Sequence, residues 1–204
     1  MRFGAKLSTG RSHVKAANET FTKKYSWQGG LYFRWNIERK IYLQPELLFH
    51  RQSFNEVISS NNQITNNLHY ARGQVLTGFK PIGFGLYFNA GIYYAYLLGG
   101  NQQVEIDRNT TETFLNDLPV QNNESAPFVK NDAGYLLGGT LSINKGAFAI
   151  GVLHSRGFNS IVNNNYWLNE PEKQNTLRNS STHFFIQKSI IKSKRPKNVN
   201  QNIW

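Results

Sequence analysis

Two long runs of alternating apolar and polar residues, Tyr25 to Ile37 and Ile41 to Phe54, dominate the pattern of the chain. Odd positions are mainly apolar and even positions mainly polar, which gives a strand one apolar and one polar face. Only Glu38, Arg39 and Lys40 separate the runs, so they predict a long β-hairpin. Ordinary strands have about 5–6 residues, whereas strands of roughly 10 residues or more suit a tilted crossing of a bilayer.

The same alternation predicts six further strands, at about 2–9, 68–79, 84–96, 129–143, 147–158 and 182–191. Tight turns join the second strand to the third, the fourth to the fifth and the sixth to the seventh. Long polar loops, at about 10–23, 59–67, 101–127 and 157–177, make the other connections. Outer-membrane barrels have an even number of strands, short periplasmic turns and long extracellular loops. We therefore expect an all-β fold, an eight-stranded antiparallel up-and-down transmembrane β-barrel with both termini in the periplasm.

Composition agrees with one barrel domain, expected over residues 1–191 of the 204 and followed by a basic tail over residues 192–204. The mean hydropathy of -0.51 is compatible with a membrane barrel, because only alternate residues of its strands face lipid. The absence of cysteine excludes disulfides and thiolate metal sites. Strand-like residues follow Met1 directly, so for an exported protein we expect a mature chain whose signal peptide was removed.

Aromatic residues gather towards the ends of the expected strands. Their amphipathic rings suit the two membrane interfaces, so they predict an aromatic girdle at each interface. The expected girdle residues are Trp35, Phe84 and Phe148 near the turns, and Tyr25, Trp27, Tyr94 and Tyr96 near the loops.

A soluble barrel of the lipocalin type is the main structural alternative, with the apolar face inward and the polar face towards water. Periodicity does not separate the two arrangements, but residue size does. The interior of an eight-stranded barrel is just wide enough for side chains or one small ligand. The apolar face carries bulky residues such as Trp27, Phe33 and Trp35, whereas the polar face is rich in glycine and charge. Residue size therefore favours the membrane barrel.

Charged residues on the polar face are expected to form an ion-pair network that fills the lumen, because an unpaired buried charge is costly. Glu46 and Arg34 lie on neighbouring strands and should pair. A narrow anion-preferring pore is the functional alternative, since inward cations outnumber inward anions. The expected network contains Arg34, Glu46, Arg72, Lys6, Asp132 and Lys130.

The residues indicate no enzyme, no cofactor and no metal site. His154 and Ser155 would suit a lipid-modifying esterase, but adjacent strand residues face opposite sides and do not meet as base and nucleophile. His50, His69 and His183 lack metal-ligand spacing.

The net charge of +11 is spread over the lumen and the loops, so we expect no nucleic-acid partner. A local basic run occurs only near the C-terminus. In the periplasm this tail would meet anionic lipid headgroups or an acidic partner protein. The basic residues of the expected tail are Lys192, Lys194, Arg195 and Lys197.

Four segments carry a resemblance to one protein family: YLQPELLFHRQSF from Tyr42, FGAKLSTG from Phe3, LYFNAGIYYAYLLGG from Leu86 and NDAGYLLGGTLSINKGAFAIGV from Asn131. They resemble strands of the PorT-like outer-membrane β-barrel proteins of Bacteroidota. Where such sequences often carry an Arg-Tyr pair in the seventh strand, this chain has Leu153 and His154. The resemblance implies an outer-membrane barrel, and one branch of the family is tied to type IX protein secretion.

We therefore expect an integral outer-membrane protein with a structural or protein-interaction role, such as an accessory to a secretion complex or another envelope complex. Its expected partners are outer-membrane lipid and an envelope protein, which would be bound through the extracellular loops or the basic tail. A soluble ligand-binding barrel, a narrow pore and a lipid-modifying membrane enzyme remain the alternatives.

Overall fold

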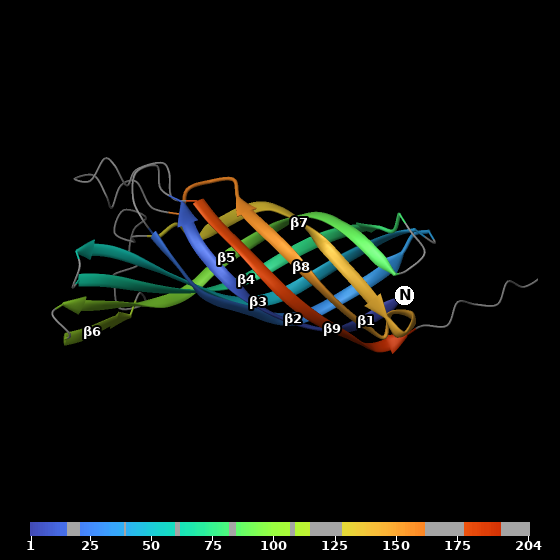
Figure 1. Ribbon diagram of the computed structural model, residues 1–204, viewed down its shortest axis with the longest axis horizontal. Helices are drawn as coiled ribbons and strands as arrows, with labels where there is room; N and C mark the ends of the chain where they lie inside the picture. Colours follow the sequence, from blue (N-terminus) through green and yellow to red (C-terminus); the bar gives the residue numbers. More distant parts are fainter. Residues whose placement is uncertain are drawn as a thin grey trace, which may run out of the picture.

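The computed structural model describes residues 1–15, 21–38, 40–59, 62–81, 85–106, 109–114, 128–161 and 178–192. Eight antiparallel strands in this part of the chain close into a barrel (Figure 1). The predicted fold class is thereby confirmed. Within the same ranges, no helix has the length and apolarity needed to cross a membrane.

The barrel follows chain order around its wall, and β1 closes the ring by pairing with β9. A ninth described strand, β6, lies outside the ring and pairs with β5. The strands are β1 (Arg2–Lys15), β2 (Phe21–Asn36), β3 (Ile41–Ser59), β4 (Asn62–Phe79), β5 (Leu86–Ile106), β6 (Asn109–Phe114), β7 (Asn131–Ile143), β8 (Phe148–Gly157) and β9 (Arg178–Lys192).

The side chains alternate between the two sides of the wall as the sequence predicts. Leu31, Leu47 and Ile92 are exposed on the outside, whereas Tyr32, Leu48 and Tyr93 beside them are buried inside. The outward apolar residues continue around all eight strands, which gives an apolar surface much larger than soluble monomers expose. This arrangement excludes the lipocalin-type alternative, in which the apolar face would line the interior.

The two ends of the barrel differ. At one end, named the turn end here, short connections join β2 to β3, β4 to β5 and β7 to β8, and the N-terminus lies there (Figure 1). The β7–β8 connection is a single turn of 3₁₀ helix, Asn144–Gly146. Asn144 and Gly146 have positive φ angles of 50° and 81°, a region that Asn and Gly enter at low cost. The opposite end is named the loop end.

Several strands are longer than the sequence analysis predicts. The polar residues at the ends of β1, β3, β4 and β5 continue the pairing instead of forming loops, and β6 lies within the loop predicted at 101–127. Lys192 pairs with Arg2, so it belongs to β9 and the expected tail boundary is one residue early. The remainder of the tail lies outside the described residues.

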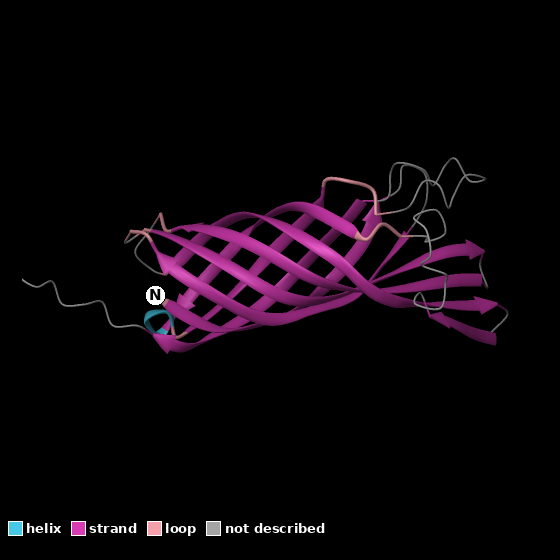
Figure 2. Ribbon diagram, turned by 180° about the vertical axis from the view of Figure 1, so that it is seen from behind, coloured by secondary structure: helices cyan, strands magenta, loops and turns pink. Residues whose placement is uncertain are grey.

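At the loop end, β3, β4, β5 and β6 extend past the closed ring and form what we name the projecting sheet (Figures 1 and 2). Its pairings run from Ser59 opposite Asn62 through Asn62 opposite Ile106 to Ile106 opposite Asn109. Amide and hydroxyl side chains predominate in this part of the chain.

Leu47→Arg tests which part of the wall lies in the bilayer. Leu47 is 68% exposed and lies midway along the barrel part of β3. Arginine on a lipid face near the midplane costs about 2–4 kcal/mol, so folding into bilayers should fall sharply. Thr111→Arg, on β6 outside the ring, should fold like the unchanged protein. Heat-modifiable gel mobility after refolding into vesicles measures both, and equal folding of the two variants would contradict the assignment.

Candidate functional site

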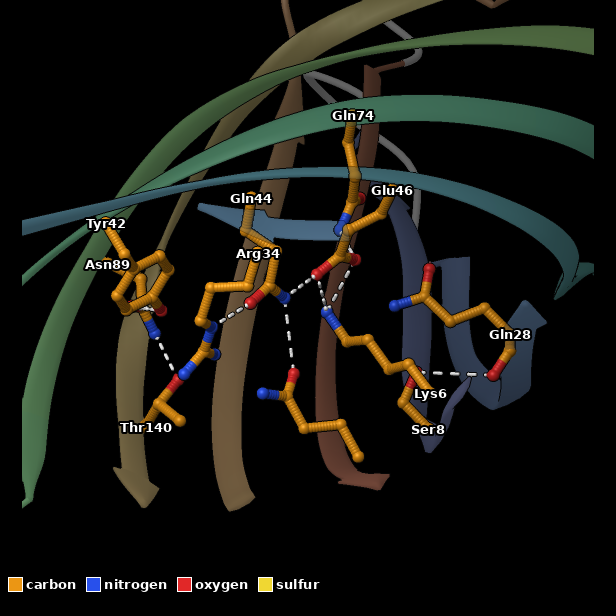
Figure 3. A network of polar contacts seen from close by, with 11 residues as sticks. Lys6, Ser8, Gln28, Arg34, Tyr42, Gln44, Glu46, Gln74, Asn89 and Thr140 are labelled. Carbon is orange, nitrogen blue, oxygen red and sulfur yellow. Dashed lines mark hydrogen bonds and ion pairs between the residues drawn. The ribbon is translucent and has the colours of Figure 1, made fainter. Parts of the chain in front are cut away.

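The centre of the lumen holds a buried ion pair between Lys6 of β1 and Glu46 of β3 (Figure 3). The Lys6 Nζ atom lies 3.0 Å from Glu46 Oε1 and 2.8 Å from Oε2, and both side chains are fully buried. The same Nζ lies 4.4 Å from the centroid of the Phe185 ring, within cation–π range. The ammonium group is therefore held by a carboxylate and an aromatic face.

Two glutamines complete the shell of the Glu46 carboxylate. Gln44 Nε2 donates to Oε1 and Gln74 Nε2 donates to Oε2, each at 2.5 Å. Gln44 also donates to Gln187 of β9 at 3.2 Å. The buried carboxylate thus receives hydrogen bonds from three strands, which is the condition under which a buried charge is tolerated.

Arg34 does not contact Glu46 directly, although the sequence predicts that the two side chains pair. Its Nε donates to Gln44 Oε1 at 2.5 Å, and its guanidinium lies 4.0 Å from the ring centroid of Tyr42. The predicted direct pairing of Arg34 with Glu46 is therefore wrong, and Gln44 connects the two residues. Sequence could place both residues on the inward face, but it did not reveal that Lys6 and not Arg34 reaches the carboxylate.

Arg72 and Asp132 form a second cluster, nearer the loop end. The Arg72 guanidinium stacks 3.8 Å above the Tyr93 ring, and the Tyr93 hydroxyl donates to Asp132 Oδ2 at 3.0 Å. Asn179 Nδ2 donates to the same oxygen at 2.7 Å. The two charged residues are connected through Tyr93 and do not form a direct ion pair within the described part of the chain.

Lys130 does not belong to the lumen network. It is exposed and lies just before β7, where its backbone carbonyl accepts a hydrogen bond from the Leu97 amide. The prediction extended the alternation of β7 two residues beyond its start at Asn131. Because Lys130 precedes the strand, the inward parity of Asp132 does not apply to it.

An apolar cluster fills the lumen beside these polar groups, and the sequence analysis missed it. Phe128 and Ile161 are buried at the loop end, where the Phe128 ring packs edge-on against Phe54 at 6.0 Å. The signal was present in the sequence as apolar residues at inward positions of otherwise polar faces. The cluster contains Phe54, Leu68, Tyr70, Leu76, Tyr93, Ala95, Phe128, Leu136, Leu153, Ile161 and Phe185.

Inward glycines make room for the aromatic rings of the lumen. A Cβ atom at Gly78 would lie 2.0 Å from the Tyr42 ring, and one at Gly134 would lie 2.5 Å from the Tyr93 ring. A guanidinium group stacks on each of these rings, so the glycines position Arg34 and Arg72 indirectly. The glycine-rich polar face is thus explained by packing.

The predicted girdle residues lie on the outer wall where they are described. Trp35 and Phe148 lie towards the turn end, and Tyr25, Tyr94 and Tyr96 towards the loop end, all exposed. Trp27 is half-buried against Phe49, with ring centroids 5.5 Å apart. Phe84 lies outside the described residues, as do Lys194, Arg195 and Lys197 of the tail.

The structure separates the residues weighed for catalysis. His154 faces outward and contacts Thr182 at 3.0 Å, whereas Ser155 faces inward and contacts Ser181 at 2.7 Å. Ser26 Oγ lies 2.7 Å from His183 Nε2, but both residues are buried inside the barrel, away from any substrate in solution. The described ranges contain no group of three or more His, Cys, Asp or Glu side chains placed to hold a metal ion.

Comparison with known families adds to this geometry. Residues 1–163 match the family described as "Outer membrane protein beta-barrel domain". The chain belongs to this family. Its place in the family agrees with the outward apolar wall and makes it an outer-membrane barrel protein.

Solved structures of the same kind are similar to this outer-membrane barrel. Neisserial surface protein A (NspA) has 7% sequence identity and a TM-score of 0.52, covering 91% of this chain and 96% of that chain. The attachment invasion locus protein Ail of Yersinia pestis has 10% identity and a TM-score of 0.48, covering 92% of this chain and 97% of that chain. No curated protein matches the chain.

The Lys6–Glu46 pair is expected to dominate the stability of the lumen. Glu46→Gln leaves the Lys6 ammonium buried without its counter-charge, which should lower the free energy of unfolding by about 3–5 kcal/mol. Adding Lys6→Met should recover part of this loss, because contacting residues couple. Urea unfolding in lipid vesicles, followed by tryptophan fluorescence, measures the cycle.

Arg34→Met provides the matched control for that cycle. Arg34 reaches Glu46 only through Gln44, so its coupling to Glu46→Gln should be clearly smaller than that of Lys6→Met. Stronger coupling to Arg34 than to Lys6 would restore the pairing predicted from sequence and contradict the structure.

Proposed function

We propose that this outer-membrane barrel is a non-catalytic recognition protein, which binds an envelope or extracellular protein through its projecting sheet. The observation that carries the proposal is the extension of four described strands past the ring at the loop end. Binding groups commonly lie where a rigid scaffold presents them to solvent. The resemblance to PorT-like proteins makes a secretion complex of the envelope one candidate partner.

The filled lumen supports recognition over transport. Lys6, Glu46 and Arg72 are almost completely buried, and the apolar cluster extends along the lumen from Phe128 at the loop end to Leu76. Eight strands leave an interior just wide enough for side chains. A narrow pore would need a continuous polar path, which this packing opposes.

Side-chain hydrogen bonds connect the strands at the base of the projecting sheet, where Thr65 and Asn66 are buried. Thr65 Oγ1 donates to Asn55 Oδ1 at 2.9 Å, and Lys24 Nζ donates to Thr65 Oγ1 at 2.9 Å. Gln102 Nε2 donates to Asn66 Oδ1 at 3.1 Å. These contacts connect β2, β3, β4 and β5, so the sheet is organised before a partner arrives, which lowers the entropic cost of binding.

The proposal requires the loop end to face outward and the turn end to face the periplasm, as in barrels with short periplasmic turns. Single cysteines at Thr111 and Asn144 test this in the cysteine-free chain. An impermeant maleimide on intact cells should label Thr111→Cys and not Asn144→Cys, while both should react after lysis. Labelling of Asn144→Cys alone on intact cells would invert the barrel.

The partner itself is tested by photo-crosslinking in the native host. A benzophenone side chain at Thr111 should yield a discrete protein adduct, because this position is exposed on β6. The same group at Ile92, on the lipid face of the barrel, is the matched control and should yield lipid adducts only. The absence of any protein adduct at Thr111 would remove the support for recognition and favour a purely structural role.

A further inference from the structure

Arg72 of β4 lies in the lumen, where one face of its guanidinium stacks on the Tyr93 ring. The side chain is 2% exposed, and its guanidinium carbon lies 3.8 Å from the centroid of the Tyr93 ring. Cation–π stacking engages the face of the guanidinium plane and leaves the N–H groups at its edge available.

One edge of this guanidinium has no hydrogen-bond partner among the described residues. Both Arg72 Nε and Nη2 are buried, and neither has a hydrogen-bond partner among the described residues. These two atoms form the side-on fork of arginine, whose parallel N–H groups match the two oxygens of a carboxylate-like anion. Asp132 does not fill the fork: its Oδ2 accepts from Tyr93 and Asn179, and its Oδ1 is buried without a hydrogen-bond partner among the described residues.

Two further buried polar groups near Arg72 also lack a hydrogen-bond partner among the described residues. The Tyr70 hydroxyl and His50 Nε2 are buried without a hydrogen-bond partner in the described part of the chain. Tyr70 is the preceding inward residue of β4, and His50 of β3 pairs directly with it, with ring centroids 6.2 Å apart. Each of these groups can donate a hydrogen bond. Among the described residues, unpartnered groups able to donate thus lie at three neighbouring inward positions, and the unpartnered acceptor Gln74 Oε1 lies at the next inward position of β4.

The buried charges of the lumen also favour an anion, because they carry a net positive charge. Lys6, Arg34 and Arg72 are three buried cations, whereas Glu46 and Asp132 are the two buried carboxylates of the described residues. Lys6 pairs with Glu46, and Arg72 makes no direct ion pair with any residue that the structure describes. A buried cation without a counter-charge is costly, and an anion at the fork would offset that cost.

We infer that Arg72, with Tyr70 and His50, forms an internal binding site for one small planar oxyanion of the carboxylate, nitrate or bicarbonate class. The fork selects two coplanar oxygens, and the Tyr70 hydroxyl and His50 Nε2 are the neighbouring unpartnered groups that can donate to the same anion. The narrow interior excludes larger anions. This site lies inside the barrel, in the lumen, and is independent of recognition by the projecting sheet.

Formate is the probe for this site. The protein is refolded in a zwitterionic detergent in the presence of ¹³C-formate, so that entry through the barrel ends is not required. At constant ionic strength, ¹³C NMR should show saturable broadening or a separate bound resonance. Arg72→Lys keeps the charge but removes the fork, so the affinity should fall about tenfold or more, as expected for losing a charge-assisted hydrogen bond.

Two further variants keep the test decisive. Arg11→Lys, at an exposed position of β1, should bind formate like the unchanged protein. Tyr70→Phe should weaken formate binding several-fold without changing charge, and it replaces Arg72→Lys if that variant fails to fold by heat-modifiable mobility. Absence of saturable binding to the unchanged protein would mean a site filled by water only. Equal binding to Arg72→Lys would mean adventitious binding elsewhere; either result overturns the inference.

Discussion

Burial of the Glu46 carboxylate constrains much of the structure around it. A carboxylate removed from water must have its oxygens fully occupied, and here Lys6, Gln44 and Gln74 bring donors from β1, β3 and β4 to it. These donors converge on Glu46 when β1 to β4 pair in the observed register. A shift of one residue would turn each side chain to the lipid side. The ion pair therefore selects one register of the barrel as well as stabilising it.

The wall is adapted to this interior through its glycines. Gly78 leaves space for the Tyr42 ring, on which Arg34 stacks. Gly134 leaves space for the Tyr93 ring, on which Arg72 stacks. Each cation is thus positioned by an aromatic ring, and each ring by a missing side chain on another strand. The polar network, the aromatic rings and the glycines form one packing arrangement, in which the apolar outer face takes no part.

The sequence predicted the barrel because a period of two is a property of each strand alone. It did not predict the partner of Glu46, because that depends on which long side chains reach across the lumen from β1 and β2. Lys130 was misplaced since alternation does not mark where a strand begins. The ends of β4 and β5 were missed because Asn, Gln and Thr are typical of loops, yet here their side chains bond to neighbouring strands.

The two regions of the molecule divide its chemistry. Inside the ring, the charged side chains are buried among neighbouring strands and shielded from both solvent and lipid. They therefore stabilise the fold and contact only small species that enter the lumen. At the loop end, the same strands continue past the ring, and amide and hydroxyl side chains bond to each other at the base of this extension. Because these outer segments extend β3, β4 and β5 of the wall, the rigid barrel fixes their direction. A partner bound there would meet a surface whose geometry is set by the pairing that closes the ring.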